Sequence, residues 1–374
     1  MPTLTENQLS RKGANKSQEA YERLTALAQK LGPSAKLPKV TELRRDLQVS
    51  ITTLDSVLTQ LEHQNIIFRK QGSGIYVSPQ LRQICVGLVC EPAFFQAGTS
   101  PFWSQLVEAA RLRALESGEL FRFYMAMPFG DLDVPVHSDL VEDVRAKRIQ
   151  GVIFVGNNHA ALQWLEKNGV PAVVFAGRAR YLVEIDGPML VRQALDHVLE
   201  RGAQRPALLV PWDVAVEPSE RHFYSPEGRE FRDHLQRRGL PCDPGLVWET
   251  RAMGSEVDSI PATRQGQGIQ AVETLLSRKG DQPDALISMD DMMTRGVLTG
   301  LRRLGRTPGR DILVVSHTNK GSTVLLGEEG VAFVEVDPAE VVRTLFSQLE
   351  YLMNGQVPPH PWALVPARIL DSSA

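Results

Sequence analysis

A regular alternation of short apolar runs and amphipathic stretches fills the chain from Ile84 onward and limits the folds it can adopt. Runs such as ICVGLVC (84–90) and GVIFVG (151–156) have the length of buried strands, and stretches with helical periodicity separate many of them. This order predicts a mainly parallel sheet with helices on both faces. Because about 290 residues of this pattern exceed what one doubly wound sheet normally uses, we expect two lobes.

The boundaries of these elements follow from where the apolar runs begin and end. The predicted strands are 84–90, 120–126, 151–156, 171–176, 206–210, 285–289, 311–316, 331–336 and 363–370. The clearest helices are 102–117, 188–202 and 264–278.

The first 80 residues follow a different pattern. Residues 1–16 are polar without periodicity, and we expect a flexible arm there. Three helical stretches follow, from Ser17 to Leu31, within 39–48, and after a predicted N-cap at Ser50. The tight connection between the last two is typical of a helix-turn-helix. The predicted buried positions are Tyr21, Leu24, Leu27, Ala28, Leu31, Val40, Leu43, Leu47, Leu54, Val57, Leu58 and Leu61.

A glycine-rich stretch, FRKQGSGIYV (68–77), lies between two β-rich segments, IIFRK (66–70) and GIYVS (74–78). A glycine loop that holds a nucleotide phosphate leads into a helix N-terminus, where backbone N–H groups face the anion. Here the chain returns to a strand instead. The stretch therefore predicts a β-hairpin and not a nucleotide-binding loop.

The charge is unevenly distributed along the chain. Residues 1–80 contain 11 Lys and Arg against 7 Asp and Glu, a net charge of +4, and the remainder has a net charge of −7. A basic unit on an acidic body fits a polyanion-binding head.

Residues 37–79, LPKVTELRRDLQVSITTLDSVLTQLEHQNIIFRKQGSGIYVSP, resemble the winged helix-turn-helix of the GntR family of bacterial transcription regulators. The resemblance implies double-stranded DNA as a partner, with the third helix in the major groove and the hairpin as a wing. The family commonly has arginines where this chain has Thr41, Ile51 and Asp55, so we expect the wing to make an unusual share of the DNA contacts. An alternative is a winged helix that serves protein contacts. The predicted DNA-binding residues are Arg44, Arg45, Ser50, Thr52, Thr53, Arg69, Lys70, Gln71, Gly72, Ser73 and Gly74.

Residues 84–370 resemble the effector domain of the LacI/GalR regulators, through SPFWSQLVEAARLRALESG, RAKRIQGVIFVG, HVLERGAQRPALLV and ISMDDMMTRG. The resemblance implies a two-lobed, periplasmic-binding-protein-like domain of doubly wound parallel sheets. It also implies a homodimer on a two-fold related operator and a small-molecule effector, a sugar above all, between the lobes. A GntR-type head on such a body is the arrangement of arabinose-repressor-like regulators. The predicted domains are an arm (1–16), the winged helix (17–80) and an effector-binding and dimerisation domain (81–374).

The same resemblance points to effector-binding residues. Asp291 matches an aspartate that contacts ligand hydroxyls at a helix start, whereas Asp290 suits a helix N-cap. Glu227 stands where the family has an arginine, for which Arg221 or Arg229 could substitute. If Glu227, Asp291 and Asp337 all face the cleft, their negative charges would disfavour phosphorylated or carboxylate effectors. The full predicted set is Phe102, Trp103, Asn157, Arg178, Arg221, Glu227, Arg229, Asp291, His317 and Asp337.

The sequence gives little support for a disulfide, a metal site or a catalytic site. The three cysteines have no paired spacing, and Cys85 and Cys90 should point to opposite faces of one strand, so we expect free, buried thiols and no structural zinc. No nucleophile motif or metal-ligand spacing occurs, so no cofactor and no enzymatic activity are expected. No apolar run has the length of a membrane span, which favours a cytoplasmic protein. Two alternatives stay open: an aminotransferase-like enzyme fused to a GntR head, and a ligand-independent dimeric regulator with a degenerate pocket.

Overall fold

The computed structural model describes residues 6–79, 81, 83–95, 99–125, 136, 138–211, 225–248, 263–278, 280 and 282–370, with the side chains of residues 6–15 and Ala93 excepted. The chain divides into two compact units, which are treated separately below. The first unit comprises residues 1–85 with the short segments 118–120 and 141–150, and the second comprises the remainder.

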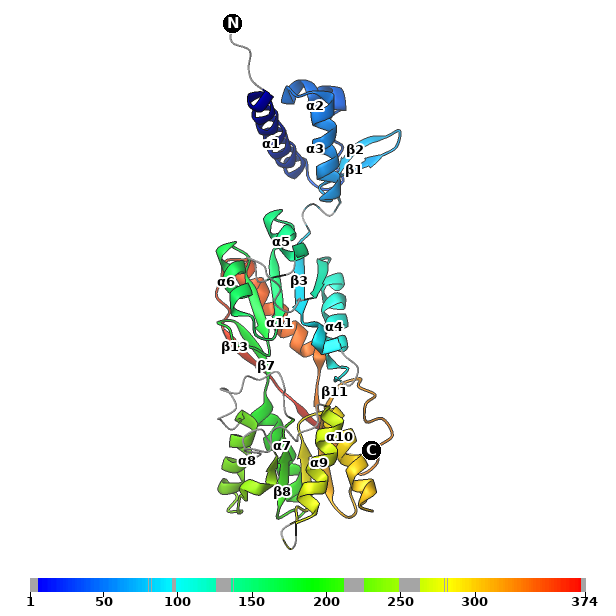
Figure 1. The fold of residues 1–374 in the computed structure, drawn as a ribbon, viewed down its shortest axis with the longest axis vertical. Helices are drawn as coiled ribbons and strands as arrows, with labels where there is room; N and C mark the ends of the chain where they lie inside the picture. The colour runs from blue at the N-terminus through cyan, green and yellow to red at the C-terminus, as the bar shows by residue number, and fades with distance from the viewer. Residues whose placement is uncertain are drawn as a thin grey trace. The chain divides into compact units, whose positions relative to one another are not determined.

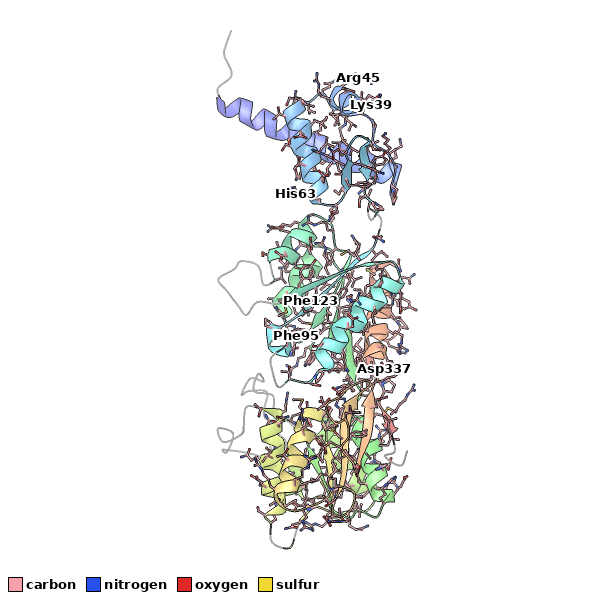
Figure 2. The ribbon with its side chains drawn as sticks, turned by 90° about the vertical axis from the view of Figure 1, so that its right-hand side faces the viewer. Lys39, Arg45, His63, Phe95, Phe123 and Asp337 are labelled. Carbon is pink, nitrogen blue, oxygen red and sulfur yellow. The ribbon has the colours of Figure 1, made fainter. Side chains whose placement is uncertain are left out.

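The first unit contains a three-helix head with a hairpin (Figure 1). The α3 helix packs against α1 and against the first hairpin strand. The Ser50 side chain accepts a hydrogen bond from the Thr53 N–H and so caps α3, as predicted. Figure 2 shows Lys39 and Arg45 near α2, and His63 at the far end of α3. The elements are α1 (Glu6–Leu31), α2 (Val40–Leu47), α3 (Ile51–His63), β1 (Ile67–Lys70) and β2 (Gly74–Val77).

The core of the head follows the predicted periodicity, although Tyr21, Leu27, Val40 and Leu47 are only partly buried and Leu31 is an exception. All four predicted α3 positions are buried, together with Leu24, Ala28 and Leu43. Leu31 was predicted to be buried but is 41% exposed, because the helix ends at this residue and its last turn leaves the core. Residues 6–16, predicted as part of a flexible arm, belong to α1, which begins at Glu6. No proline interrupts the helix in this stretch.

The second unit is built from two six-stranded sheets (Figure 1). The first lobe has the strand order β13-β7-β6-β5-β3-β4, and the second has β14-β12-β11-β10-β8-β9. Neighbouring strands are parallel, for example β3 with β5 and β10 with β11, but β14 runs antiparallel to β12. The two-lobed α/β architecture predicted from the alternation is therefore confirmed. The strands are β3 (Cys85–Cys90), β4 (Leu120–Met125), β5 (Gly151–Val155), β6 (Ala172–Phe175), β7 (Leu182–Ile185), β8 (Pro206–Leu209), β9 (Val247–Trp248), β10 (Ala285–Ser288), β11 (Leu313–Asn319), β12 (Val331–Val336), β13 (Trp362–Val365) and β14 (Arg368–Leu370).

Helices cover the faces of both sheets. They are η1 (Pro92–Phe95), α4 (Phe102–Glu116), α5 (Ser138–Arg145), α6 (His159–Lys167), α7 (Gly187–Glu200), α8 (Pro226–Arg237), η3 (Pro244–Leu246), α9 (Arg264–Leu276), α10 (Asp291–Arg303) and α11 (Pro338–Met353). Both Cys85 and Cys90 are buried and free, as predicted, and burial raises the pKa of Cys90 to about 12.

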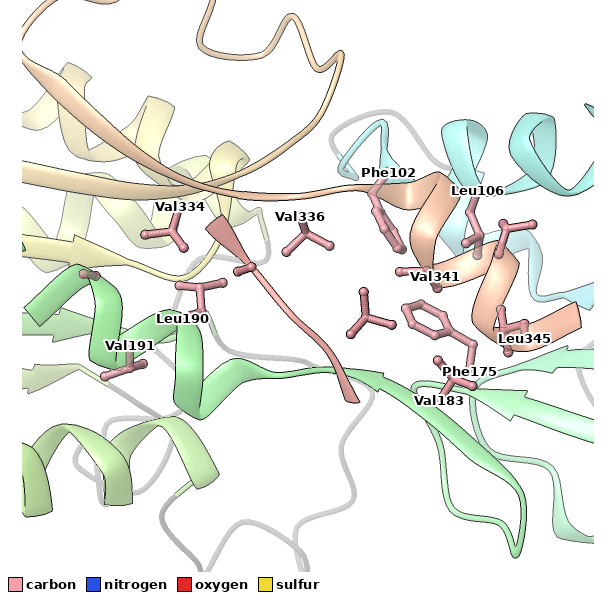
Figure 3. Packing of buried hydrophobic residues seen from close by; sticks show 14 of the residues in the cluster. Phe102, Leu106, Phe175, Val183, Leu190, Val191, Val334, Val336, Val341 and Leu345 are labelled. Atoms are coloured by element: carbon pink, nitrogen blue, oxygen red, sulfur yellow. The ribbon is translucent and has the colours of Figure 1, made fainter. Parts of the chain in front are cut away.

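Three segments connect the lobes, because the chain leaves one sheet and continues in the other. They join β7 to α7, β12 to α11, and β13 to β14. One hydrophobic cluster continues along these crossings, and Val336 and Val341 lie on either side of one of them (Figure 3). The crossing segments therefore carry buried side chains that belong to the shared core of both lobes. These segments would have to bend if the two lobes moved relative to each other.

Two predictions about strands were wrong. The run 363–370 was predicted as one strand, but it forms β13 in the first lobe and β14 in the second. Pro366 lies between them, and proline interrupts strand pairing because it has no backbone N–H. The strand β7 was not predicted, since only four residues form it and it precedes a long helix directly.

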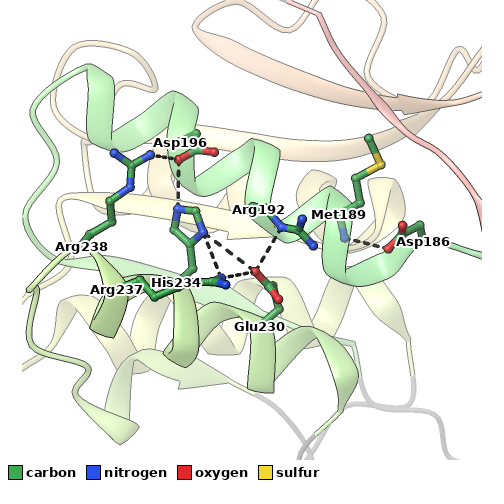
Figure 4. Close-up of polar contacts among 8 residues, drawn as sticks. All are labelled: Asp186, Met189, Arg192, Asp196, Glu230, His234, Arg237 and Arg238. Atoms are coloured by element: carbon green, nitrogen blue, oxygen red, sulfur yellow. Dashed lines mark hydrogen bonds and ion pairs between the residues drawn. The ribbon is translucent and has the colours of Figure 1, made fainter.

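A network of charged side chains joins α8 to α7 (Figure 4). The Nε2 atom of His234 lies 2.9 Å from an Asp196 carboxylate oxygen, and that carboxylate also accepts a hydrogen bond from Arg238. The Glu230 carboxylate accepts from Arg192 at 3.2 Å and from Arg237 at 2.6 Å. These contacts fix the position of α8 on the second lobe.

The α9 and α10 helices approach each other closely through two glycines. A Cβ atom at Gly296 would lie 2.0 Å from the Gln265 carbonyl oxygen, and one at Gly268 would lie 2.1 Å from that of Met293. No side chain fits at either position, so the backbones themselves make the contact.

Replacing Gly296 by alanine should therefore destabilise the second lobe. We expect Gly296→Ala to lower the free energy of unfolding by about 2–3 kcal/mol, because the obstacle is backbone that must shift. Urea unfolding measures the change. The matched control is Arg295→Ala on the exposed side of α10, which should stay within about 0.5 kcal/mol of wild type. Equal stability of the two variants would contradict the close helix contact.

Candidate functional site

The N-terminal end of α3 presents a small set of side chains in the position of a recognition helix. The Ser50 Oγ atom accepts from the Thr53 N–H at 3.0 Å and lies 2.8 Å from the Thr53 hydroxyl oxygen. The hydroxyls of Ser50 and Thr53, two of the predicted DNA-binding residues, thus take part in the helix cap. Ile51 and Thr52 are exposed at the same end.

The wing is formed as predicted, with β1 and β2 antiparallel and Lys70 paired with Gly74 across the turn. Gly72 has a φ angle of +72°, which favours glycine at this turn. The Ser73 hydroxyl oxygen lies 2.7 Å from the Tyr76 hydroxyl, so Ser73 helps to hold the turn. Lys70 and Gln71 are exposed and available to a partner.

Arg69, which the sequence predicted as a DNA-facing donor, contacts the recognition helix instead. One of its terminal nitrogens lies 3.1 Å from an Asp55 carboxylate oxygen and 3.1 Å from the Thr59 hydroxyl. Its Nε atom lies 3.5 Å from Glu62, whose other carboxylate oxygen accepts from the Arg69 backbone N–H at 3.0 Å. The Arg69 side chain therefore joins the wing to α3. Its positive charge also offsets the negative charge of Asp55, which would otherwise repel DNA phosphates.

The α2 helix supplies further cations. Arg44 and Arg45 are both exposed, and Arg45 pairs with the adjacent Asp46 at 3.1 Å. Lys36 and Lys39 are exposed as well, and the Lys36 ammonium lies 5.6 Å from the centre of the Tyr76 ring. The head thus displays positive charge on α2, on the segment before it and on the wing.

In the effector unit, Asp291 is fully buried and contacts both lobes. One of its carboxylate oxygens accepts from the Ser100 hydroxyl of the first lobe at 3.1 Å. The other accepts from the Ser322 hydroxyl of the second lobe at 3.2 Å. Burial raises the pKa of Asp291, although these hydroxyls and Asn319 work in the opposite direction. Ser100 follows β3 and Asp291 follows β10, so this contact joins the carboxyl ends of the two sheets, where ligands bind in such folds.

Asp290 and His317 lie beside this carboxylate. Asp290 accepts the Met293 N–H at 2.7 Å and caps α10, which confirms the role predicted for it. Burial raises the pKa of Asp290 and lowers the pKa of His317 to about 4. Among the described residues, the buried His317 Nε2 and Asn319 Oδ1 atoms have no hydrogen-bond partner. Two buried polar atoms at the carboxyl end of β11 therefore have unused hydrogen-bonding capacity.

The predicted aromatic pair belongs to a cluster at the same end of the first lobe. The Trp103 ring stacks on Phe94 with centroids 4.2 Å apart, and it meets Phe102 edge to face. Phe102 is buried against Phe175 at the end of β6, so it is a core residue. Trp103 is half-buried and has the larger share of open surface.

The remaining predicted residues that the structure describes come from several different elements. Asp337 caps α11 by accepting the Ala339 N–H, and its pKa is low because Lys320 donates to it at 3.1 Å, although burial acts to raise it. Glu227 lies over the start of α7, where a Cβ on Gly187 would be 2.0 Å from its carboxylate. Arg178 lines a groove of about 450 Å³ beside α6 with none of the other predicted effector residues. Asn157 and Arg229 are exposed, and Arg221 lies outside the described residues.

Ser100, Ser322 and Asn319 were missed. Asn319 lies at the carboxyl end of the parallel strand β11, so a strand end is the signal that could have found it. Ser100 lies in the connection from β3 to α4, just before α4 begins. Ser322 follows two residues after Lys320 in a turn, and nothing in its local sequence marks it. In the part of the chain that the structure describes, no helix is long and apolar enough to cross a membrane, and no three His, Cys, Asp or Glu side chains gather to bind a metal.

Comparison with protein families agrees with this division. Residues 16–77 match the model of the gntR family of bacterial regulatory proteins, and residues 195–371 match that of the periplasmic binding protein-like domain. The chain joins a gntR-family head to a periplasmic binding protein-like domain. The gntR resemblance is thereby confirmed, and the second resemblance is confirmed as a periplasmic binding protein-like domain over residues 195–371. Together the two domains are the composition of a ligand-responsive transcription regulator. No curated protein matches the chain.

Three solved structures of similar fold are described by their names as regulators or repressors. A regulatory protein of the LacI family from Chloroflexus aggregans is 19% identical with a TM-score of 0.61, and the match covers 77% of this chain and 96% of the other. The transcriptional regulator CelR in complex with cellobiose is 21% identical (TM-score 0.57, coverage 87% and 91%). The Lac repressor bound to ONPG is 18% identical (TM-score 0.59, coverage 87% and 92%). Because these sequence identities are low, the similarity establishes a shared fold and no more.

The low pKa of His317 predicts a pH-dependent stability. Between pH 6.5 and about 4 the unfolded chain binds a proton that the folded ring does not, so the folded state loses stability as the pH falls through this range. The loss through this one group amounts to up to about 3 kcal/mol. We expect His317→Gln, which is neutral at every pH, to lose correspondingly less stability than wild type.

Urea unfolding at pH 7.5 and pH 4.5 tests this expectation. Asp290 faces the ring and titrates in both proteins, so the comparison between variant and wild type isolates the histidine. An identical loss of stability in both proteins would contradict a neutral, buried His317.

Proposed function

We propose that this protein is a cytoplasmic, homodimeric regulator that binds a specific DNA operator and acts as a repressor. A small polyhydroxyl molecule, a sugar above all, binds between the lobes of the effector unit and controls operator affinity. The observation that carries the proposal is the buried Asp291 carboxylate, which accepts hydroxyl hydrogen bonds from both lobes at once.

A sugar offers the same donors that Asp291 already accepts. Two neighbouring ligand hydroxyls could replace those of Ser100 and Ser322 and leave the carboxylate equally satisfied. The open His317 Nε2 and Asn319 Oδ1 atoms add further polar partners at the same strand ends. Trp103 supplies an aromatic surface of the kind that packs on sugar C–H groups.

The charge at these strand ends favours a neutral effector. Asp290 and Asp291 are adjacent carboxylates, and a buried anion beside them would need compensation. Phosphorylated sugars and sugar acids are therefore poor candidates. The CelR and Lac repressor structures contain cellobiose and ONPG, respectively, and both ligands are uncharged at the sugar, in agreement with this choice.

Binding can reach the DNA through a change of lobe arrangement. A ligand that replaces the Ser100 contact alters the hydrogen bonds between the lobes, and the crossing segments transmit a change in lobe angle. Since a two-fold dimer presents two heads at a fixed spacing, a changed spacing alters operator affinity. In this proposal the protein performs no chemistry on its effector, in contrast to an aminotransferase-like body, whose cofactor would absorb visible light.

Asp291→Asn should weaken effector binding. Loss of the carboxylate removes charge-assisted hydrogen bonds, so we expect the Kd of a sugar found by a thermal-shift panel to rise roughly 10- to 100-fold. Calorimetry measures this Kd. Asp233→Asn on the exposed face of α8 is the matched control.

The same panel separates the alternatives. A sugar that binds wild type and Asp291→Asn equally would show that Asp291 only joins the lobes. No thermal shift with any sugar would favour the ligand-independent regulator, because Asp291 is satisfied by the protein's own hydroxyls.

The wing should contribute strongly to DNA binding. Lys70→Ala combined with Gln71→Ala removes the two exposed donors of the turn, and we expect operator affinity to fall by more than tenfold at about 0.15 M salt. Fluorescence anisotropy measures the affinity, with Lys167→Ala on α6 as the control for lost charge. Unchanged affinity would contradict a role for the wing.

A further inference from the structure

The structure points to thymine as the base that the recognition helix selects. We propose that Ile51 packs its side chain on the 5-methyl group of a thymine in each operator half-site, in place of the guanine contact that an arginine would make. This inference rests on the proposed function, because it assumes that the head binds a DNA operator.

Ile51 has the position and the exposure for such a contact. It is the first residue of α3, and residues at this end of a recognition helix are the ones that reach base edges. Its side chain is 53% exposed, although isoleucine is among the residue types most often buried. An aliphatic side chain exposed at this end has one apolar partner on the major-groove edge of DNA, the thymine methyl group.

The surroundings of Ile51 are suited to a methyl group. A groove of about 600 Å³ lies between α3, the start of α2 and the wing, and its lining includes Val40, Ile51 and Ile75. Asp55 also lines it, but its carboxylate pairs with Arg69 at 3.1 Å. The floor of the groove is therefore apolar, with an acidic group that is already neutralised.

Arg69, the arginine that lines the groove, does not take the place of the guanine-contacting arginine found in the GntR family. Arg69 is the only arginine that lines the groove, and it is held by Asp55, Thr59 and Glu62. A guanine needs a donor pair aimed at its O6 and N7 atoms. Arg69, which lines the same groove as Ile51, thus has the role of fixing the wing.

Charge at the rim of the groove holds DNA there. Lys70 lines the groove, and Lys36 reaches the wing beside Gly74, where a Cβ would lie 2.9 Å from its Cε atom. Such ammonium groups attract phosphates without reading sequence, so they orient the duplex while Ile51 contacts the base.

The test uses the full-length protein and DNA selected from a random-sequence duplex library. In the selected sequence, each conserved thymine is replaced in turn by deoxyuridine, which differs only in lacking the methyl group. For one thymine per half-site we expect about a 3- to 10-fold loss of wild-type affinity, as follows from burial of one methyl group. Ile51→Ala should bind the thymine and uracil duplexes equally, and Gln60→Ala, at an exposed position farther along α3, should retain the wild-type preference.

The outcomes separate this inference from the function on which it rests. A selected duplex whose affinity is unchanged by every uracil replacement overturns the thymine contact and leaves DNA binding established. The same is true if Ile51→Ala keeps the full preference for thymine. If no duplex is enriched from the library, the proposed function itself fails.

Discussion

The buried carboxylate of Asp291 is the interaction on which the arrangement of the effector unit depends. A fully buried aspartate is costly unless hydrogen bonds satisfy both of its oxygens, and here the donors come from different lobes. The contact between the lobes is therefore required by the carboxylate itself. Any molecule that supplies equivalent hydroxyl groups competes directly with the protein's own serines, which makes this contact suited to ligand control.

The head shows how one ion-pair network changes the roles of its neighbours. Asp55 on α3 forms an ion pair with Arg69 of the wing, and the Arg69 side chain also contacts Glu62 and Thr59. The wing and the recognition helix are thereby held together as one surface. Ile51, several lysines and the α2 arginines remain exposed. In the proposed complex these cations contact phosphates, and Ile51 distinguishes bases.

The sequence predicted those features whose causes are local. The α3 stripe of Leu54, Val57, Leu58 and Leu61 follows from helical spacing, and the hairpin follows from the turn at 71–73. The division of 363–370 between two sheets depends on distant pairing partners, which periodicity does not encode. For the site, Asp291 was identified through the resemblance, but Asp337 resembles a ligand residue and acts as a helix cap. Ser100 and Ser322 were not predicted from the sequence, because a serine has no distinctive pattern until the fold places it beside a carboxylate.

The central claim is that effector and DNA bind to coupled states of one protein. Thermodynamic linkage requires the coupling to be reciprocal, so the effect can be measured from the sugar side. The most direct measurement is calorimetric titration of the sugar into free protein and into protein saturated with its selected duplex. The account predicts that the duplex weakens sugar binding at least about fivefold, by the same factor by which the sugar weakens DNA binding. Identical sugar affinities with and without DNA would contradict it.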